Sequence, residues 1–376
     1  MIYHLLKHLI KGHYGYENPL FRATVAILVA FLVVWTLGPS VIRWLIRMKC
    51  GDIPDFDHRE LNELTIHKAN VPTMGGLLIL FGVATGVLLL ADLTVFYIHL
   101  ALTCMAWLGA VGFCDDWFKL MDKGKNRNRD GLKFYQKLLF QMGLGVMLGF
   151  FIYKVGKQAY QGQEIELFRI LSIPFVKGDL QNPILLSVPA FIIITILVVA
   201  GTSNAVNLTD GMDGLAAGCV AMCCLVFMLL SFAVGNEDLA RYLQYSHIPR
   251  AGELSVLCGA MLGASLGFLW YNANPAQVFM GDTGSLPLGG LIGFVAIVIR
   301  QELMLLIVGG VFVIEALSVM LQVGYFKASG GKRLFLIAPI HHHFHLKGWK
   351  ENQVVIRFWL LSALFAVVAL ATTKLR

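Results

Sequence analysis

The sequence predicts an all-α polytopic membrane protein with about ten transmembrane helices and both termini on the periplasmic or outer side. Three observations support this prediction: the composition, the lengths of the apolar runs, and the distribution of basic residues between loops. Of the 376 residues, 57% are hydrophobic and 14% are charged, and the mean hydropathy is +0.70. Soluble domains have a much more even balance, so the expected solvent is a lipid bilayer.

Apolar runs that could cross a bilayer as helices recur from Phe21 to Leu370. A hydrocarbon core needs roughly 17–25 residues of helix, and each run is close to that length. The expected spans are 21–48, 71–91, 93–114, 134–153, 184–204, 212–235, 254–271, 284–300, 302–327 and 353–373. No internal repeat or low-complexity tract interrupts them, so we expect a single integral membrane domain over residues 1–376.

The remaining features of composition exclude several other classes. Met1–Asn18 carries polar residues throughout and lacks the apolar core of a cleavable signal peptide. The seven cysteines are odd in number and show no CxxC spacing, so neither a disulfide framework nor a structural zinc site is expected. No feature indicates binding to nucleic acid.

The loops after the odd-numbered spans hold more lysine and arginine than the other loops, which favours a cytoplasmic location for them. These basic residues include Arg43, Arg47, Lys119, Lys123, Lys125, Arg127, Arg129, Lys332 and Arg333. The same loops contain nearly every polar cluster that could perform chemistry, namely His67-Lys68, Asp115-Asp116, Asn204–Asp213, Asn272–Asp282 and His341–His345. We therefore predict one active site at the cytoplasmic membrane surface.

Asp115 and Asp116 are adjacent carboxylates at the end of the third span. Two such charges at a membrane boundary repel each other unless a cation is shared, which predicts a divalent metal or a lysine partner. Two solvated charges at a helix end are the alternative. Paired aspartates also occur in DDxxD prenyltransferases, but Lys119 stands where a third carboxylate would be.

A second polar cluster, Asn204–Gly214, contains Asn204, Asn207, Asp210 and Asp213 between two apolar runs. These side chains offer oxygen ligands and hydrogen bonds in a glycine-rich loop that can approach a ligand closely. The spacing of three predicts that Asp210 and Asp213 share one side of a helical turn. The alternative is a capped helix start, with Asn207 or Asp210 as the N-cap.

Asp282 lies between two glycines, beside the hydroxyls of Thr283 and Ser285. This arrangement suits a Mg²⁺ ligand that leaves coordination positions for water and phosphate, whereas a tight turn is the alternative. Phe279 is placed either to stack on a base or to anchor the chain at the membrane interface.

Four histidines occur between Pro339 and His345, and they are followed by further chain, so they are no purification tag. Alternating histidines on a strand could bind zinc, but the other clusters contain only oxygen ligands, which favours Mg²⁺ and leaves the imidazoles for phosphates. Glu315 lies near the middle of the ninth span, where either a functional role or a helix–helix hydrogen bond would account for it. Gly309-Gly310 would let that helix bend.

Taken together, these loops resemble the phospho-N-acetylmuramoyl-pentapeptide transferase family, the bacterial enzymes that form the first lipid intermediate of peptidoglycan. The resemblance covers about Phe21 to Arg376. It rests on Pro72–Gly76, Asp115-Asp116, Asn204–Gly214, Ala276–Ser285 and the run from Ala338 to Trp349. The first loop, Cys50–His67, and Ala69-Asn70-Val71 depart from the family pattern.

The resemblance implies ten transmembrane helices, both termini outside, and a Mg²⁺-dependent site on the cytoplasmic face of the bacterial inner membrane. It implies that Asp282 binds Mg²⁺ and that Asp115 and Asp116 are the catalytic pair. Substrate binding is implied for Asn204, for Asn207, Asp210, Asp213 and Phe279 at the uridine end, and for Lys68, Lys119, Lys137, His341 and His342 at the phosphates. Lys137 is preferred to Lys133 because Gln136-Lys137-Leu138 is more similar to the family's run.

The implied substrates are uridine diphosphate N-acetylmuramoyl-pentapeptide and undecaprenyl phosphate, with UMP as the released product. We expect direct attack by the lipid phosphate, which is mostly dianionic at neutral pH because its second pKa is roughly 6. A sister enzyme that transfers N-acetylglucosamine phosphate is the nearest alternative, and the histidine loop argues against it. An ion-coupled transporter would place its carboxylates near the midplane, where only Glu315 lies. The sequence is compatible with a homodimer.

Overall fold

The computed structural model describes residues 3–5, 15–48, 50–51, 68, 71–121, 131–160, 163–175 and 184–373, with the backbone alone at 157–160 and 163–167. Several residues named above lie outside the described residues: His67, Ala69, Asn70, Lys123, Lys125, Arg127 and Arg129.

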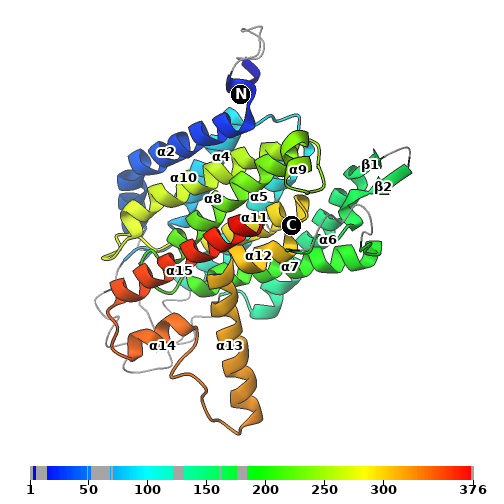
Figure 1. Ribbon diagram of the computed structural model, residues 1–376. Coiled ribbons are helices and arrows are strands. Elements are labelled where there is room, and N and C mark those ends of the chain that lie inside the picture. Colours follow the sequence, from blue (N-terminus) through cyan, green and yellow to red (C-terminus); the bar gives the residue numbers. More distant parts are fainter. Residues whose placement is uncertain are drawn as a thin grey trace.

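Helices make up almost all of the described structure (Figure 1). Eight of them are long and apolar enough to cross a membrane. They are α2 (Pro19–Arg47), α5 (Phe96–Met121), α6 (Phe134–Val155), α7 (Val188–Thr209), α8 (Leu215–Gly235), α10 (Leu254–Asn272) with the preceding 3-10 turn η5 (Ala251–Glu253), α13 (Gly310–Ala328) and α15 (Glu351–Thr372). Two shorter apolar helices complete the set, α4 (Gly76–Leu90) and α11 (Asp282–Val298).

The outer surfaces of these helices carry large apolar side chains. Leu28, Leu139, Leu197 and Leu360, on four different helices, each expose more than half of their surface. In water such a surface would be unstable, whereas lipid is the environment that it matches. The structure thus confirms the prediction of a helical, multi-pass membrane protein.

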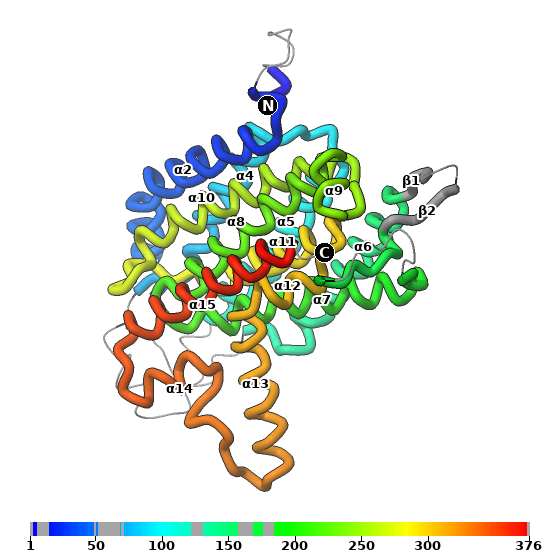
Figure 2. Tube along the Cα trace, in the orientation of Figure 1, coloured from blue at the N-terminus to red at the C-terminus, as the bar shows by residue number. Residues whose placement is uncertain are grey.

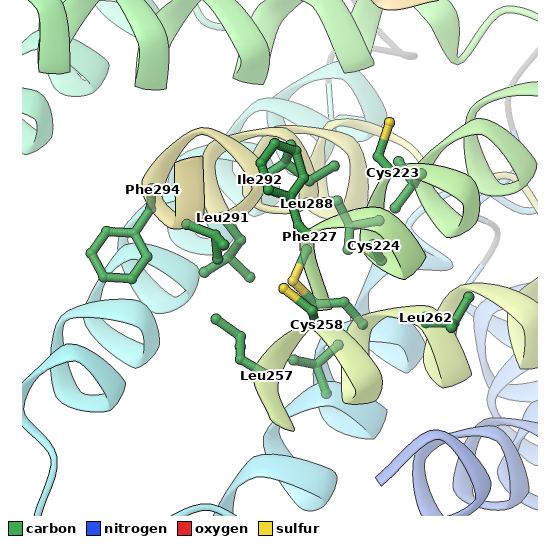
Figure 3. Close-up of a cluster of buried hydrophobic side chains, with 14 of the residues drawn as sticks. Cys223, Cys224, Phe227, Leu257, Cys258, Leu262, Leu288, Leu291, Ile292 and Phe294 are labelled. Atoms are coloured by element: carbon green, nitrogen blue, oxygen red, sulfur yellow. The ribbon is translucent and has the colours of Figure 1, made fainter. Parts of the chain in front are cut away.

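Helix α11 lies at the centre of the bundle, and all of its residues are buried. It packs against α5 and α7, while α10 packs against α2, α4 and α8 (Figure 2). Figure 3 shows the contact between α8, α10 and α11, where Phe227, Cys224, Cys258 and Leu288 fill the interior. The central position of α11 matters because its first residue is Asp282.

One prediction about secondary structure is wrong. The ninth run, 302–327, is not one helix: it breaks at Gly309 into α12 (Glu302–Val308) and α13, and α13 projects from the bundle at the bottom of Figure 1. Besides the helices, β1 (Lys157–Tyr160) and β2 (Gln163–Glu166) form a small antiparallel hairpin, and the described structure remains mostly helical. The short elements that remain are η1 (Gly15–Glu17), η4 (Leu167–Arg169), α9 (Glu237–Tyr242) and α14 (Ile340–Leu346).

The segments before α4 and α11 are joined by main-chain hydrogen bonds, although they are far apart in the sequence. The amide of Phe279 donates to the carbonyl of Pro72 at 2.8 Å, and the amide of Gly75 donates to the carbonyl of Phe279 at 2.8 Å. A third bond runs from Gly76 to Met280 at 2.9 Å. This pairing holds the two loops together at the end of the bundle where α5 and α7 also end.

Candidate active site

Three carboxylates from two helices meet at this end of the bundle. Asp115 and Asp116 lie near the end of α5, and Asp282 begins α11, against which α5 packs. Oxygen atoms from the three side chains lie within 4.8 Å of one another, and all three residues are buried. Helix packing therefore assembles the cluster that the sequence divides between two motifs.

Asp116 holds the start of α11. Its carboxylate accepts hydrogen bonds from the amide of Thr283 at 2.9 Å, the hydroxyl of Thr283 at 2.6 Å and the amide of Asp282 at 3.2 Å. The first amides of a helix have no partner within the helix and attract negative charge. Asp116 satisfies them from a neighbouring helix and so fixes the position of Asp282.

Asp115 and Asp282 share two lysines. The ammonium nitrogen of Lys119 lies 2.6 Å from Asp115 Oδ2 and 3.4 Å from Asp282 Oδ1. Lys137, which comes from α6, lies 2.9 Å from Asp115 Oδ2 and 2.6 Å from Asp282 Oδ2. Asp115 Oδ1 also accepts a hydrogen bond from the amide of Leu132 at 2.7 Å, which ties the start of α6 to the cluster.

A cavity of about 200 Å³ opens beside these groups. Its lining residues are Thr73, Asp116, Lys119, Leu120, Asn207, Asp210, Phe279, Gly281 and Asp282. Burial, together with the charges of Asp282 and Asp116, raises the pKa of Asp210 well above its usual range. The lining of the cavity thus combines carboxylates and an ammonium group with an aromatic ring and an amide.

A second charged cluster lies next to Phe279. The ammonium nitrogen of Lys68 is 2.6 Å from Asp213 Oδ1 and 2.5 Å from Glu351 Oε1, and it lies 6.0 Å from the centre of the Phe279 ring. Asp213 Oδ2 accepts hydrogen bonds from Asn274 at 2.9 Å and from the amide of Ala276 at 3.0 Å.

His341 and His342 are buried under the segment that joins α7 and α8. A Cβ atom on Gly211 would lie 2.3 Å from His341 Nε2 and 3.1 Å from His342 Nε2, so only glycine leaves room for the two rings. His341 Nδ1 lies 3.1 Å from Glu315 Oε2, and both of these side chains are fully buried. Burial, with His345 and Lys68 nearby, lowers the pKa of His341 to about 3 and that of His342 well below its usual value.

The structure corrects three expectations about these motifs. Asp210 and Asp213 do not share a helical turn: α7 ends at Thr209, and Gly214 with φ of 80° precedes α8, so neither Asn207 nor Asp210 is its N-cap. Asn204 is not among the residues that line the cavity, and its amide donates to Gln141 on α6 at 2.7 Å; its role in substrate binding stays a prediction.

The histidines lie on the short helix α14, not on a strand. Of the described residues that could ligate a metal, only Asp115, Asp116 and Asp282 form a group of three, and this group has no histidine.

Sequence reasoning missed Thr73 and Glu351. Thr73 lines the cavity and lies inside the Pro72–Gly76 motif. The motif could have indicated this residue, because a hydroxyl beside glycines is available to a ligand. Glu351 gave no such signal, since an acidic residue at the start of a helix is ordinarily explained by the helix dipole.

The amino-acid sequence of the chain is similar to those of known proteins. The family model described as Glycosyl transferase family 4 matches residues 98–300. The chain is 47% identical over 358 residues to a phospho-N-acetylmuramoyl-pentapeptide-transferase of Nitratidesulfovibrio vulgaris, covering 95% of this chain and 94% of the relative. It is 45% identical over 356 residues to the protein of that name from Oleidesulfovibrio alaskensis, with coverage of 95% and 94%. The protein of that name from Desulfotalea psychrophila is 46% identical over 382 residues, with both chains fully covered.

Proposed function

The chain belongs to the phospho-N-acetylmuramoyl-pentapeptide-transferase family, and on that premise we propose that it transfers phospho-N-acetylmuramoyl-pentapeptide from a uridine diphosphate carrier to undecaprenyl phosphate. UMP is the second product. The acceptor is a lipid, which agrees with a catalytic domain that is itself embedded in the membrane.

The cavity next to the lysine–carboxylate cluster is the observation that carries this proposal. Among its lining residues, Lys119 offers positive charge to phosphates, and Phe279 offers a ring on which a base can stack. Asn207 and Asp210 line the same cavity and can form hydrogen bonds with a nucleoside. A nucleoside diphosphate therefore matches the chemistry of the cavity lining.

The three buried carboxylates are suited to Mg²⁺. Carboxylate oxygens are its preferred protein ligands, and a site with few protein ligands leaves positions for phosphate oxygens. The cluster of three carboxylates and two ammonium groups has a formal charge of −1, which a divalent cation would reverse. We propose Asp282 as the principal ligand. When bound, the cation would neutralise charge on the diphosphate.

In the proposed reaction an oxygen of the lipid phosphate attacks the sugar-side phosphorus of the diphosphate. A new P–O bond forms as the bond to the UMP oxygen breaks, and UMP leaves with the bonding electron pair. Lys119 and Lys137 lie where they can bind the phosphate oxygens and stabilise the charge that develops on them.

The contacts of the aspartate pair favour direct attack over a covalent aspartyl intermediate. Asp116 already accepts three hydrogen bonds from the start of α11, and Asp115 is bound by both lysines. We infer that Asp116 positions Asp282 and that Asp115 orients the lysines. Neither residue needs to remove a proton, since the lipid phosphate is mostly dianionic at neutral pH.

We also propose that the site faces the cytoplasm in the bacterial inner membrane, with both termini on the outer side. The basic loops support this orientation. We propose that a homodimer would carry one such site in each subunit.

Purified protein should be given undecaprenyl phosphate with either uridine diphosphate N-acetylmuramoyl-pentapeptide or uridine diphosphate N-acetylglucosamine, and UMP release measured. We expect release with the first substrate only, and none after the metal is chelated. UMP release with uridine diphosphate N-acetylglucosamine and not with the muramoyl-pentapeptide substrate would assign the chain to the sister activity. Full activity under chelation would exclude a role for Mg²⁺.

A further inference from the structure

Glu351 is the first residue of α15, and it is buried at the junction of three segments. Its Oε1 atom lies 2.5 Å from the ammonium nitrogen of Lys68 and accepts a hydrogen bond from the amide of Asp213 at 3.0 Å. One oxygen atom therefore connects the C-terminal helix to the loop after α2 and to the segment between α7 and α8.

The contacts of Asp213 show what this connection holds in place. Asp213 binds Lys68 through Oδ1, and binds Asn274 and Ala276 in the segment before α11 through Oδ2. The next residue, Gly214, is fixed by Asn272 at 3.0 Å and by Trp359 of α15 at 3.2 Å. Lys68 lies between two carboxylates, so its ammonium group is restrained on the side that faces Phe279.

We propose that Glu351 is a positioning residue, which holds Lys68 and the main chain of Asp213 where they support the uridine end of the substrate site. The inference rests on the proposed function. Glu351 does not line the cavity, and it acts through its two partners. A buried ammonium group that loses one of two carboxylates changes its position, and the Asp213 amide loses its acceptor.

The proposal predicts a change in substrate affinity that depends on the substrate. Glu351→Ala should raise KM for the uridine diphosphate substrate by about 10- to 100-fold, the usual effect of hydrogen bonds to charged groups. KM for undecaprenyl phosphate should stay near the wild-type value. Glu351→Gln keeps an acceptor for the Asp213 amide and loses the charge beside Lys68, so its KM should be intermediate.

Gln353→Ala is the matched control, because Gln353 lies in the same first turn of α15. Its Oε1 accepts a hydrogen bond from the amide of Lys350 at 3.1 Å and so supports the start of the helix. If Glu351 served only to begin α15, Gln353→Ala would raise the same KM by a similar factor, and that result would overturn the proposal. If Glu351→Ala fails to fold, Glu351→Gln decides the question.

A double-mutant cycle tests the partner. Lys68→Met and Glu351→Gln should each raise KM for the uridine diphosphate substrate. The KM of the double variant should not exceed the higher of the two single-variant KM values. Additive effects would mean that Glu351 does not act through Lys68.

UMP binding, measured by calorimetry on the same proteins, separates this proposal from the proposed function. If the wild type binds UMP but transfers nothing, and the Glu351 variants bind UMP more weakly, the proposed function is contradicted and the positioning role is supported. Normal transfer with an unchanged KM in both Glu351 variants would contradict the positioning role alone.

Discussion

Gly112→Ala should strongly reduce transfer, because Gly112 lies where α5 meets the first residues of α11. A Cβ atom at this position would be 2.2 Å from the carbonyl oxygen of Asp282, 2.5 Å from its carbonyl carbon and 2.7 Å from the amide nitrogen of Thr283. All three are backbone atoms, which cannot turn aside as a side chain can. The two helices must therefore separate by about 1 Å to restore normal contact.

That displacement would act directly on the site. The Thr283 amide donates to Asp116 at 2.9 Å, and a further 1 Å or so would break this hydrogen bond and move Asp282 away from Lys119 and Lys137. A misplacement of about 1 Å can cost about 100-fold in rate. Overpacking should also lower the free energy of unfolding by about 1–3 kcal/mol.

UMP release and the apparent Tm should be measured for Gly112→Ala beside Gly143→Ala. Gly143 is in α6, and a Cβ atom there meets nothing within 4 Å. The control should keep wild-type turnover and gain about 0.4–1 kcal/mol in stability. If Gly112→Ala behaves like this control, then α5 and α11 do not need to meet closely, and our account of how Asp116 positions Asp282 is wrong.

Four further predictions concern single features. Asp282→Asn should lower UMP release by at least about 100-fold, because a charged Mg²⁺ ligand is lost; wild-type turnover at ordinary Mg²⁺ would exclude that role. Phe279→Ala should weaken UMP binding by about 1–3 kcal/mol, the value of stacking on a base, and unchanged calorimetry would refute the stacking. The folded-state pKa of His341 is about 3 and the unfolded value is 6.5, so only the unfolded chain takes up a proton as the pH falls below 6.5. By pH 5 this should cost about 2 kcal/mol of stability, and His341→Gln should reduce the loss seen in Tm measurements. Cysteines at Lys332 and Glu237 should react with an impermeant reagent from opposite sides of the membrane; only Cys114 among the native cysteines is exposed and needs replacing first.

The helices were largely predictable because their apolar runs must match the thickness of a bilayer. The break at Gly309 was predictable only in part: Gly309-Gly310 indicated a bend, but the apolar residues on both sides did not show that one helix would end there. The hairpin β1–β2 was missed because strands of four residues are too short to give a clear alternation of apolar and polar residues.

The clusters of the site were predictable as a group, but their pairings were not. Polar residues in the odd loops indicated one face, and the structure brings together Asp115, Asp282 and Lys137 there. Sequence spacing cannot show that Asp116 caps a helix 166 residues away, or that Glu351 holds Lys68. Such contacts depend on which helices pack side by side, and that arrangement is set by the whole bundle.

The most direct test of the central claim is a crystal structure with uridine diphosphate and Mn²⁺ in place of Mg²⁺, in which anomalous scattering locates the metal. We predict a metal peak at Asp282, the diphosphate beside Lys119, and the uracil ring against Phe279. A metal bound away from the three carboxylates, or a nucleotide outside the cavity that Asn207 and Asp210 line, would contradict the account.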